Sequence, residues 1–348
     1  MQSTLPTALL ASLLIAVPTF GSTAVSEPAG FTRQQINPGL QTAGITLNNK
    51  IVASATIVAS EARAALLDPA CANLAAVFDD SAAYYAEIVG DTANTFAGDR
   101  FDIDVEATRA SADPVLFFKD ADHNSTALAL STDALVGHRV VIRKHLMIAD
   151  VFGAGEDSVL HAGFRYEEAD SLLFFDRLSG GYATYYLCFA EDGTKAWRKA
   201  GSFGCMNDTI IPPATGVFVQ RNATVGTELV LLGSVRTNDF VLPLRAGYNF
   251  VSSPYPVADA TADLQLGSAS GFTAASEASK ADQILVFNGA EFDRYYLRDA
   301  AGVSEETWLR SGGDAVAASA ASLLSHERSV FIKKLAADPD FVVRRSFL

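Results

Sequence analysis

The sequence predicts an all-β protein made of two similar antiparallel β-sandwich-like modules from an internal duplication, with a small barrel-like β insertion in the first module. Two observations predict this class. Segment 169–187, "ADSLLFFDRLSGGYATYYL", returns in altered form at 281–299 as "ADQILVFNGAEFDRYYLRD". Short runs rich in β-branched and aromatic residues, separated by Gly, Asn and Asp, also fill most of the chain, and this pattern is typical of β-hairpins.

The repeat continues past these two segments in the same order. The corresponding landmarks are Tyr185–Leu187 with Tyr295–Leu297, the two tryptophans Trp197 and Trp308, and "GVFVQR" at 216–221 with "SVFIKK" at 329–334. Gaps between the two copies fall in predicted turns. Because order, spacing and both tryptophans are kept, the sequence predicts that one unit was copied within the chain.

Each copy is predicted to form a set of antiparallel strands. In the first copy the runs are the apolar "SLLFF" at 171–175, "YATYYLCFA" at 182–190, "AWRKAG" at 196–201 and the closing "VFVQR". A strand-turn-strand pattern at 240–257 leads into the second copy, and 34–52 resembles it more weakly. We therefore expect the first module to begin near residue 31.

An insertion is predicted to interrupt the first module. Its alternating runs are "AAYYAEIVGD" at 82–91, "GDRFDIDVEA" at 98–107, "PVLFFKD" at 114–120 and "GHRVVIRK" at 137–144. Such alternation is typical of strands buried on one face. The predicted organisation is a signal peptide at 1–24, a first module at 25–59 plus 145–236, an inserted β domain at 60–144, and a second module at 237–348.

The first 24 residues have the pattern of a cleaved export signal. Leu9–Phe20 is apolar, and Ser22–Ala24 fits a small-x-small cleavage site, although neither Lys nor Arg precedes the apolar core. The apolar run is shorter than the roughly 20 residues that a membrane-spanning helix needs. We expect an exported protein of the periplasm, outer surface or extracellular space, without a transmembrane helix.

Composition favours a folded, acidic protein. Hydrophobic residues make up 49% of the chain and the formal net charge is -14. The hydrophobic fraction is high enough to supply a core. The negative net charge argues against nucleic-acid binding, which depends on Lys and Arg neutralising phosphates.

The three cysteines, Cys71, Cys188 and Cys205, leave two interpretations open. Cys188 and Cys205 lie in one repeat unit and are the candidate disulfide, which export would permit and which would be worth about 3 kcal/mol. Alternatively, all three are small hydrophobic side chains. The second copy has Arg298 where the first has Cys188, so the unit itself does not require the bridge.

The sequence predicts no catalytic, cofactor or metal site. "DADHN" at 120–124 has oxygen ligands at alternate positions, as a calcium loop begins, but the Gly and Glu of such a loop are missing, which favours a solvated turn. The five histidines are not spaced as a metal motif. A Ser/His/Asp set assembled from distant residues is not excluded by composition.

The repeated aromatic residues have two interpretations. Tyr182, Tyr185, Tyr295 and Trp308 are the candidate ligand-contact residues of a sugar-stacking platform. They are also the residues that would pack the core and rim of each unit, and their presence in both copies favours packing. Exposure of the two tryptophans separates these interpretations.

The runs "YYAEIVGD", "ADSLLFFD", "IIPPATGVFVQR" and "VRTNDFVLPLRAGYNFVSSPYPV" resemble a family of uncharacterised exported β-rich proteins found in verrucomicrobial bacteria. The resemblance covers most of the mature chain and implies export and a β-rich fold, with no catalytic residues. The second copy, "SLLSHERSVFIKK" at 322–334, departs from the "IIPPATGVFV" form, because the Pro pair and the Gly are missing.

The predicted function is that of an exported, non-enzymatic, modular β protein of the cell envelope or surface with a structural or interaction role. Its partners would be envelope proteins or polysaccharide. The alternatives are a carbohydrate-binding exported module that uses the aromatic residues above, and a secreted hydrolase with a site between units.

Overall fold

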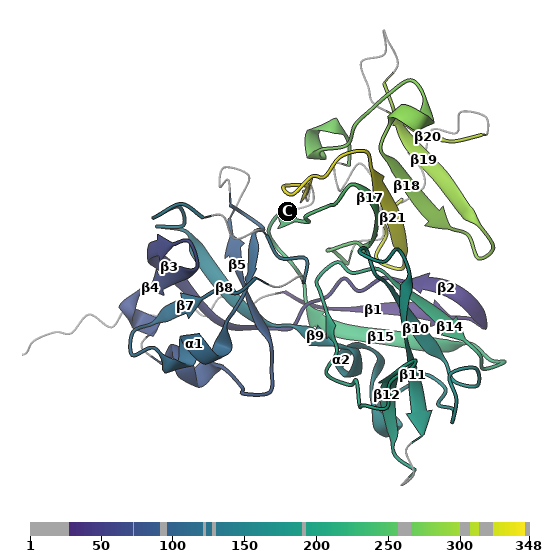
Figure 1. Ribbon diagram of the computed structural model, residues 1–348, viewed down its shortest axis with the longest axis horizontal. Coiled ribbons are helices and arrows are strands. Elements are labelled where there is room, and N and C mark those ends of the chain that lie inside the picture. The colour runs from purple at the N-terminus through teal and green to yellow at the C-terminus, as the bar shows by residue number, and fades with distance from the viewer. Residues whose placement is uncertain are drawn as a thin grey trace, which may run out of the picture.

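The all-β class is confirmed by the computed structural model (Figure 1), in which antiparallel sheets account for the architecture. The structure describes residues 28–71, 73–90, 96–120, 123–126, 130–189, 193–256, 266–299, 307–312 and 323–344. The predicted signal peptide lies outside these ranges. In the described ranges, no helix has the length and apolar character needed to cross a membrane.

Helices in the described residues are short. The α-helices are α1 (Val105–Ala110) and α2 (Ile148–Phe152), and the 3-10 turns are η1 (Pro69–Cys71), η2 (Leu74–Val77), η3 (Gly155–Asp157), η4 (Ser268–Ser270) and η5 (Ala278–Lys280). Asp104 caps α1 by accepting a hydrogen bond from the Ala107 backbone N–H, which satisfies one of the free donors at the helix start.

The first module contains a five-stranded sheet, crossed by a two-stranded ribbon. The sheet order is β12 (Lys195–Lys199), β11 (Tyr182–Phe189), β10 (Ser171–Phe175), β14 (Val217–Arg221) and β2 (Gly39–Ala43). The ribbon pairs β1 (Ala29–Ile36) with β15 (Thr227–Ser234). A short pair, β9 (Leu146–Met147) and β13 (Ile210–Ile211), lies beside them.

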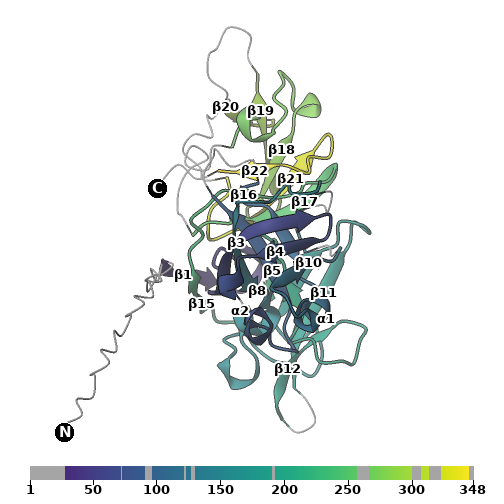
Figure 2. The same ribbon diagram turned by 90° about the vertical axis from the view of Figure 1, so that its left-hand side faces the viewer.

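The second module has the same parts at the other end of the molecule. Its five-stranded sheet has the order β20 (Thr307–Arg310), β19 (Phe292–Arg298), β18 (Gln283–Phe287), β21 (Ser329–Lys334) and β17 (Gly247–Ser252). Its ribbon is short and pairs β16 (Phe240–Val241) with β22 (Val342–Val343). Figure 2 shows the second module above the first, with the insertion facing the viewer.

The two five-stranded sheets agree in register as well as in order. Leu172 lies opposite Tyr185 in the first, and Ile284 lies opposite Tyr295 in the second. Leu187 faces Trp197 across β11 and β12, as Leu297 faces Trp308 across β19 and β20. Residues that correspond in the sequence repeat therefore occupy corresponding places in the two sheets.

A buried ion pair is also present in both modules. Asp170 Oδ2 lies 2.6 Å from Arg221 Nη1, and Asp282 Oδ2 lies 2.7 Å from Lys334 Nζ. Each carboxylate also accepts backbone hydrogen bonds from the segment before its strand and from the end of the closing strand, as in His161 N–H and Asn222 N–H to Asp170. These bonds account for the Asp at the start of both copies, since a buried carboxylate needs several donors.

The two tryptophans are core residues. Trp197 is fully buried and Trp308 is 5% exposed, so Trp308 is not a ligand-contact residue at the surface. Their indole N–H groups donate to Gly153 O at 2.7 Å and to Leu266 O at 3.0 Å. Of the two interpretations of the repeated aromatics, packing holds for both indoles.

The modules meet through a seam of aromatic rings. Phe218 of the first module stacks on Phe250 of the second with ring centroids 4.6 Å apart, and Phe175 of the first module lies 5.0 Å from Phe331 of the second. Backbone bonds cross the seam from Gly216 N–H to Phe250 O and from Ser252 N–H to Ala214 O. A Cβ at Gly216 would lie 2.7 Å from the Phe250 ring, so this approach requires glycine.

The insertion is a curled six-stranded sheet. Its order is β6 (Arg100–Asp102), β5 (Tyr84–Val89), β8 (Arg139–Lys144), β3 (Ile51–Glu61), β4 (Ala64–Leu67) and β7 (Val115–Phe117). A bridge between Ile103 and Phe118 joins the two edges, as does the bond from Lys119 N–H to Asp102 O at 3.0 Å. The predicted barrel-like shape is thus present. We call this unit the inserted barrel.

The predicted start of the insertion at residue 60 falls inside β3. That whole strand pairs with β4 and β8, so it belongs to the inserted barrel rather than to the first module. The alternation in "IVASATIV" on its own fits either assignment. The predicted end at residue 144 coincides with the end of β8.

Replacing either tryptophan should destabilise the fold. We expect Trp197→Ala and Trp308→Ala each to lower the free energy of unfolding by about 3–5 kcal/mol, because each leaves a cavity in a packed core. Chemical denaturation measures this. Phe203→Ala, at a side chain 94% exposed, is the control and should change little. Unchanged stability in both tryptophan variants would contradict the core assignment.

Candidate functional site

A buried polar layer covers the outer face of the inserted barrel. Successive side chains of a strand point to opposite faces, so Phe101 and Ile88 enter the barrel core while their neighbours face outward. The outward residues are almost completely buried: Tyr85, Glu87, Arg100, Asp102, Arg143 and, just after β8, His145. The chain that joins the two modules, residues 235–241, lies over them. This layer is therefore the junction of all three parts of the molecule.

Glu87 is the centre of charge in this layer. Its carboxylate is fully buried and forms ion pairs with Arg236 from the joining segment and, at 3.6 Å, with Arg143 of β8. Asn238 Nδ2 donates to the same carboxylate at 3.0 Å. Arg236 also donates to Asn48 at 3.1 Å, and this bond ties the segment just before the inserted barrel to the ion pairs of Glu87.

Two guanidinium groups of the layer lie over one aromatic ring, that of Phe240. Arg100 lies 3.8 Å and Arg236 lies 4.5 Å from the centroid of Phe240. Arg100 Nη1 also donates to Val241 O at 2.9 Å. The backbone approaches closely here: Gly98 has φ +92, and a Cβ on it would lie 2.5 Å from Asp239 O. Only glycine fits that position.

One carboxylate of the layer is held by two imidazoles. Asp102 Oδ1 lies 2.8 Å from His145 Nε2, and Asp102 Oδ2 lies 2.8 Å from His123 Nδ1. One donor atom from each side chain lies within 4.8 Å of the others. We call these three residues the Asp-His-His cluster. In the described residues it is the one group of three or more His, Cys, Asp or Glu side chains close enough to share an ion.

The elements of the fold place these side chains with different freedom. Asp102 ends β6 at the closure of the barrel, and His145 follows β8, with its backbone N–H bonded to Ala83 O at 2.8 Å. Their side chains are 2% and 1% exposed, whereas that of His123 is 29% exposed. The cluster is therefore buried on two sides and open to solvent at His123.

The turn that carries His123 is anchored to the first module. Asn124 Nδ2 donates to Pro213 O at 3.0 Å and to Thr215 Oγ1 at 3.3 Å. Arg100 Nη2 donates to the Asn124 carbonyl. His123 is thus held between the inserted barrel and the first module.

Burial and hydrogen bonds shift several pKa values in the layer. Burial by itself would raise the pKa of Asp102, but the hydrogen bonds to His123 and His145 hold it at about 2. Burial lowers the pKa of His145 despite the Asp102 contact, and burial lowers the pKa of Arg100 to about 10. Asp102 is therefore an anion and His145 favours the neutral imidazole at pH 7.

The donor set of the cluster supports two kinds of chemistry. Two imidazole nitrogens and a carboxylate oxygen are ligands for zinc and other first-row transition metals. In the same arrangement the carboxylate orients two imidazoles, as in general acid–base sites.

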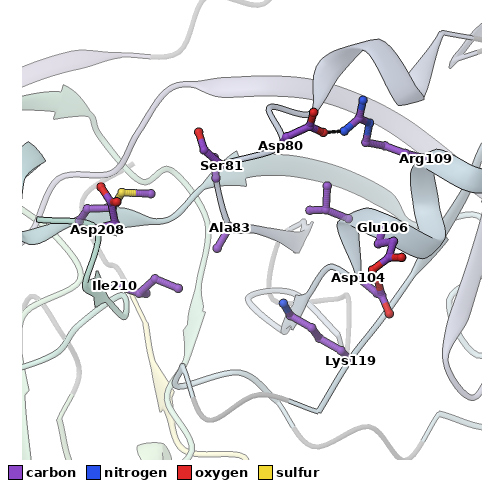
Figure 3. Close-up of a pocket in the computed structure, with 12 residues that line it drawn as sticks. Asp80, Ser81, Ala83, Asp104, Glu106, Arg109, Lys119, Asp208 and Ile210 are labelled. Carbon is purple, nitrogen blue, oxygen red and sulfur yellow. Dashed lines mark ion pairs between the residues drawn. The ribbon is translucent and has the colours of Figure 1, made fainter. Parts of the chain in front are cut away.

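A pocket of about 580 Å³ lies between the inserted barrel and the first module (Figure 3). Asp104, Glu106 and Lys119 line one side, and Asp208 and Ile210 line the other. Several charged side chains that line the pocket already form structural contacts. Asp80 pairs with Arg109, and Asp104 caps α1.

The predicted ligand-contact tyrosines are not gathered in one site. Tyr182 is 45% exposed on β11, whereas Tyr185 packs against the first core and Tyr295, in the other module, against the second core. Together with the burial of Trp308, this distribution divides the predicted platform between two modules. Tyr182 is the member of the set with an exposed ring.

The cysteines, all in the described part of the chain, are free thiols, so the candidate disulfide between Cys188 and Cys205 is not formed. Cys188 is buried in β11 with Sγ 3.2 Å from Phe189 O, while Cys205 is exposed in the loop after β12. Burial raises the pKa of Cys71.

Sequence reasoning missed the Asp-His-His cluster because its members are far apart in the chain. Asp102 and His123 are 21 positions apart, and Asp102 and His145 are 43 apart. The outward-facing Asp in "RFDID" and the His directly after the strand "RVVIRK" were the available signals. Their use required the pairing order of the strands, which the sequence does not show.

Comparisons of the chain with protein-family models, with curated proteins and with solved structures found no match. The resemblance to exported verrucomicrobial proteins stays a prediction.

The raised pKa of Asp99 predicts that the stability of the protein depends on pH. Burial raises the pKa of Asp99 to about 6 from 3.8, against the hydrogen bond from Thr126. The folded state then binds more protons than the unfolded state between these values, so this group's contribution to stability falls as pH rises from about 4 to 6.

Asp99→Asn should remove this component while keeping an acceptor for Thr126. Relative to Asp99→Asn, we expect the wild type to lose about 2–3 kcal/mol of unfolding free energy between pH 4 and 7. Denaturation at a series of pH values measures this. Parallel pH profiles for the two proteins would contradict the shift.

Proposed function

We propose that the chain is an exported, non-enzymatic, modular β protein that acts in the cell envelope or at the cell surface through protein contacts. Export rests on the signal pattern of residues 1–24. The modular character rests on the two sheets of equal order and register, and we infer that they arose by copying one unit.

The observation that carries the interaction role is the outer face of the β1·β15 ribbon. Phe31 lies directly opposite Leu232, and these side chains are 61% and 78% exposed. Val230, on the same face two residues along β15, is 45% exposed. We call these three residues the ribbon patch. Apolar side chains gathered on one exposed face are typical of interaction sites.

The corresponding ribbon of the second module differs in this respect. Phe240 and Val241 of β16 and Val343 of β22 are buried. The two copies therefore expose different surfaces, as expected if one ribbon serves the junction and the other faces a partner. Arg33 and Glu228, 3.9 Å apart, flank the ribbon patch with polar groups.

Substitution of the ribbon patch tests the proposal. We expect Phe31→Ser/Leu232→Ser to reduce binding of the purified mature protein to isolated envelope fractions by at least tenfold, since removing two large apolar contacts costs more than about 1.4 kcal/mol. Co-sedimentation measures this. Leu178→Ser, at a side chain 78% exposed in the turn after β10, is the matched control.

The result that would contradict the proposal is equal co-sedimentation of wild type, control and ribbon variant. Unchanged thermal melting of the double variant shows that any loss of binding is not caused by unfolding.

A second candidate is a carbohydrate-binding module. Tyr182 and Tyr186 point to the same face of β11, and Tyr166, 50% exposed, has its ring centroid 6.4 Å from that of Tyr186. Exposed tyrosine rings on one face can stack on sugars.

The second candidate predicts that Tyr166→Ala/Tyr182→Ala abolishes retention on polysaccharide columns. Tyr248→Ala, at a tyrosine 44% exposed in the second module, is the control and should be retained like the wild type. Equal retention of both variants, or none by the wild type, removes this candidate.

A further inference from the structure

The Asp-His-His cluster combines a buried carboxylate with two imidazoles, and its charge is unusual for a protein interior. In the described residues Asp102 forms ion pairs with the two histidines, which carry charge only when protonated. Buried carboxylates are normally paired with a cation or bound to a metal. The other anion of this layer, Glu87, has two arginines.

The nearest permanent cation is directed elsewhere. Arg100, two residues before Asp102 on β6, donates to Gly98 O at 3.3 Å, to Val241 O and to Asn124 O, and stacks on Phe240. Both of its Nη atoms donate to carbonyl oxygens, and the guanidinium lies over an aromatic ring. The side-chain hydrogen bonds of Asp102 are therefore those with the two imidazoles.

The geometry fits one ion of zinc size. Zinc binds nitrogen and oxygen at about 2.0–2.2 Å, so two ligand atoms of a tetrahedral site are about 3.3–3.5 Å apart. The two contacts in the cluster are 2.8 Å, and all three donor atoms lie within 4.8 Å of one another. To admit an ion, both nitrogen–oxygen separations must lengthen by about half an ångström, which requires a small shift of the His123 side chain and of the Asp102 carboxylate.

The exposure of the cluster supplies an entry path and a fourth ligand. Asp102 and His145 are fixed on the barrel, while the His123 side chain is 29% exposed. An ion would approach from the His123 side and keep a water molecule on that side, as open zinc sites with three protein ligands do.

We propose that Asp102, His123 and His145 form a binding site for one zinc ion, which fastens the His123 turn to the closure of the inserted barrel. Through Asn124 and its bonds to Pro213 and Thr215, the ion also holds the inserted barrel against the first module. This inference does not depend on the ribbon patch having a partner.

Titration of the chelator-treated mature protein with zinc chloride, followed by calorimetry, tests the proposal. We expect one zinc ion per chain with a sub-micromolar Kd, and at least a tenfold weaker Kd for His123→Asn. His123 is the ligand to replace because its partial exposure lets the variant fold. His161→Asn, at an exposed histidine away from the cluster, is the control and should bind zinc like the wild type.

Cobalt provides a second readout of the same site. Cobalt(II) bound by two imidazoles and a carboxylate in a four-coordinate site gives visible absorption bands. We expect these bands in the wild type and in His161→Asn, and their loss in His123→Asn. Zinc should also raise the melting temperature of the wild type more than that of His123→Asn, because a ligand bound to the folded state stabilises it.

The proposal is overturned if the wild type binds no zinc at micromolar concentrations. It is also overturned if His123→Asn binds zinc as tightly as the wild type, because the ion would then occupy another part of the surface. Asp102→Asn, which keeps the size of the side chain, should lose zinc binding as well, and retention there would exclude the carboxylate as a ligand.

Discussion

The ion pairs of Glu87 with Arg143 and Arg236 are the interaction on which the arrangement of the three parts depends. Glu87 and Arg143 lie on neighbouring strands of the inserted barrel, β5 and β8, and Arg236 comes from the segment between the modules, where it also donates to Asn48. A buried charge without its partner is costly, by about 3–5 kcal/mol when one member of a pair is removed. Moving the joining segment off the inserted barrel would therefore leave these charges buried without compensation.

Much of the architecture follows from the sequence. The Ala-Asp pairs, the Tyr-Tyr-Leu runs and the two tryptophans predicted which residues correspond, and in the structure these residues share register and burial. Such features are local, because strand alternation and turn residues depend on near neighbours. The edge of the insertion was less predictable, because β3 has a pattern that either neighbouring sheet could use and its pairing with β8 decides the matter.

The candidate site depends on contacts that no local pattern encodes. Asp102, His123 and His145 come together because the barrel closes through Ile103 and Phe118 and because Asn124 bonds to the first module. The same limit applies to the aromatic residues. Their repetition predicted packing, but Tyr182 and Tyr185, three residues apart on β11, lie on opposite faces of the strand, and only the face of Tyr185 packs against the core of the first module.

The pairing of β3 with β8 places Ile51, at the start of the insertion, opposite Arg143, at its end. The chain therefore leaves the first module and returns to it at neighbouring points. An insertion that starts and ends at neighbouring points can change in length at little entropic cost and without altering the strand order of the first module. We therefore expect differences in length and sequence among relatives of this chain to concentrate in the inserted barrel.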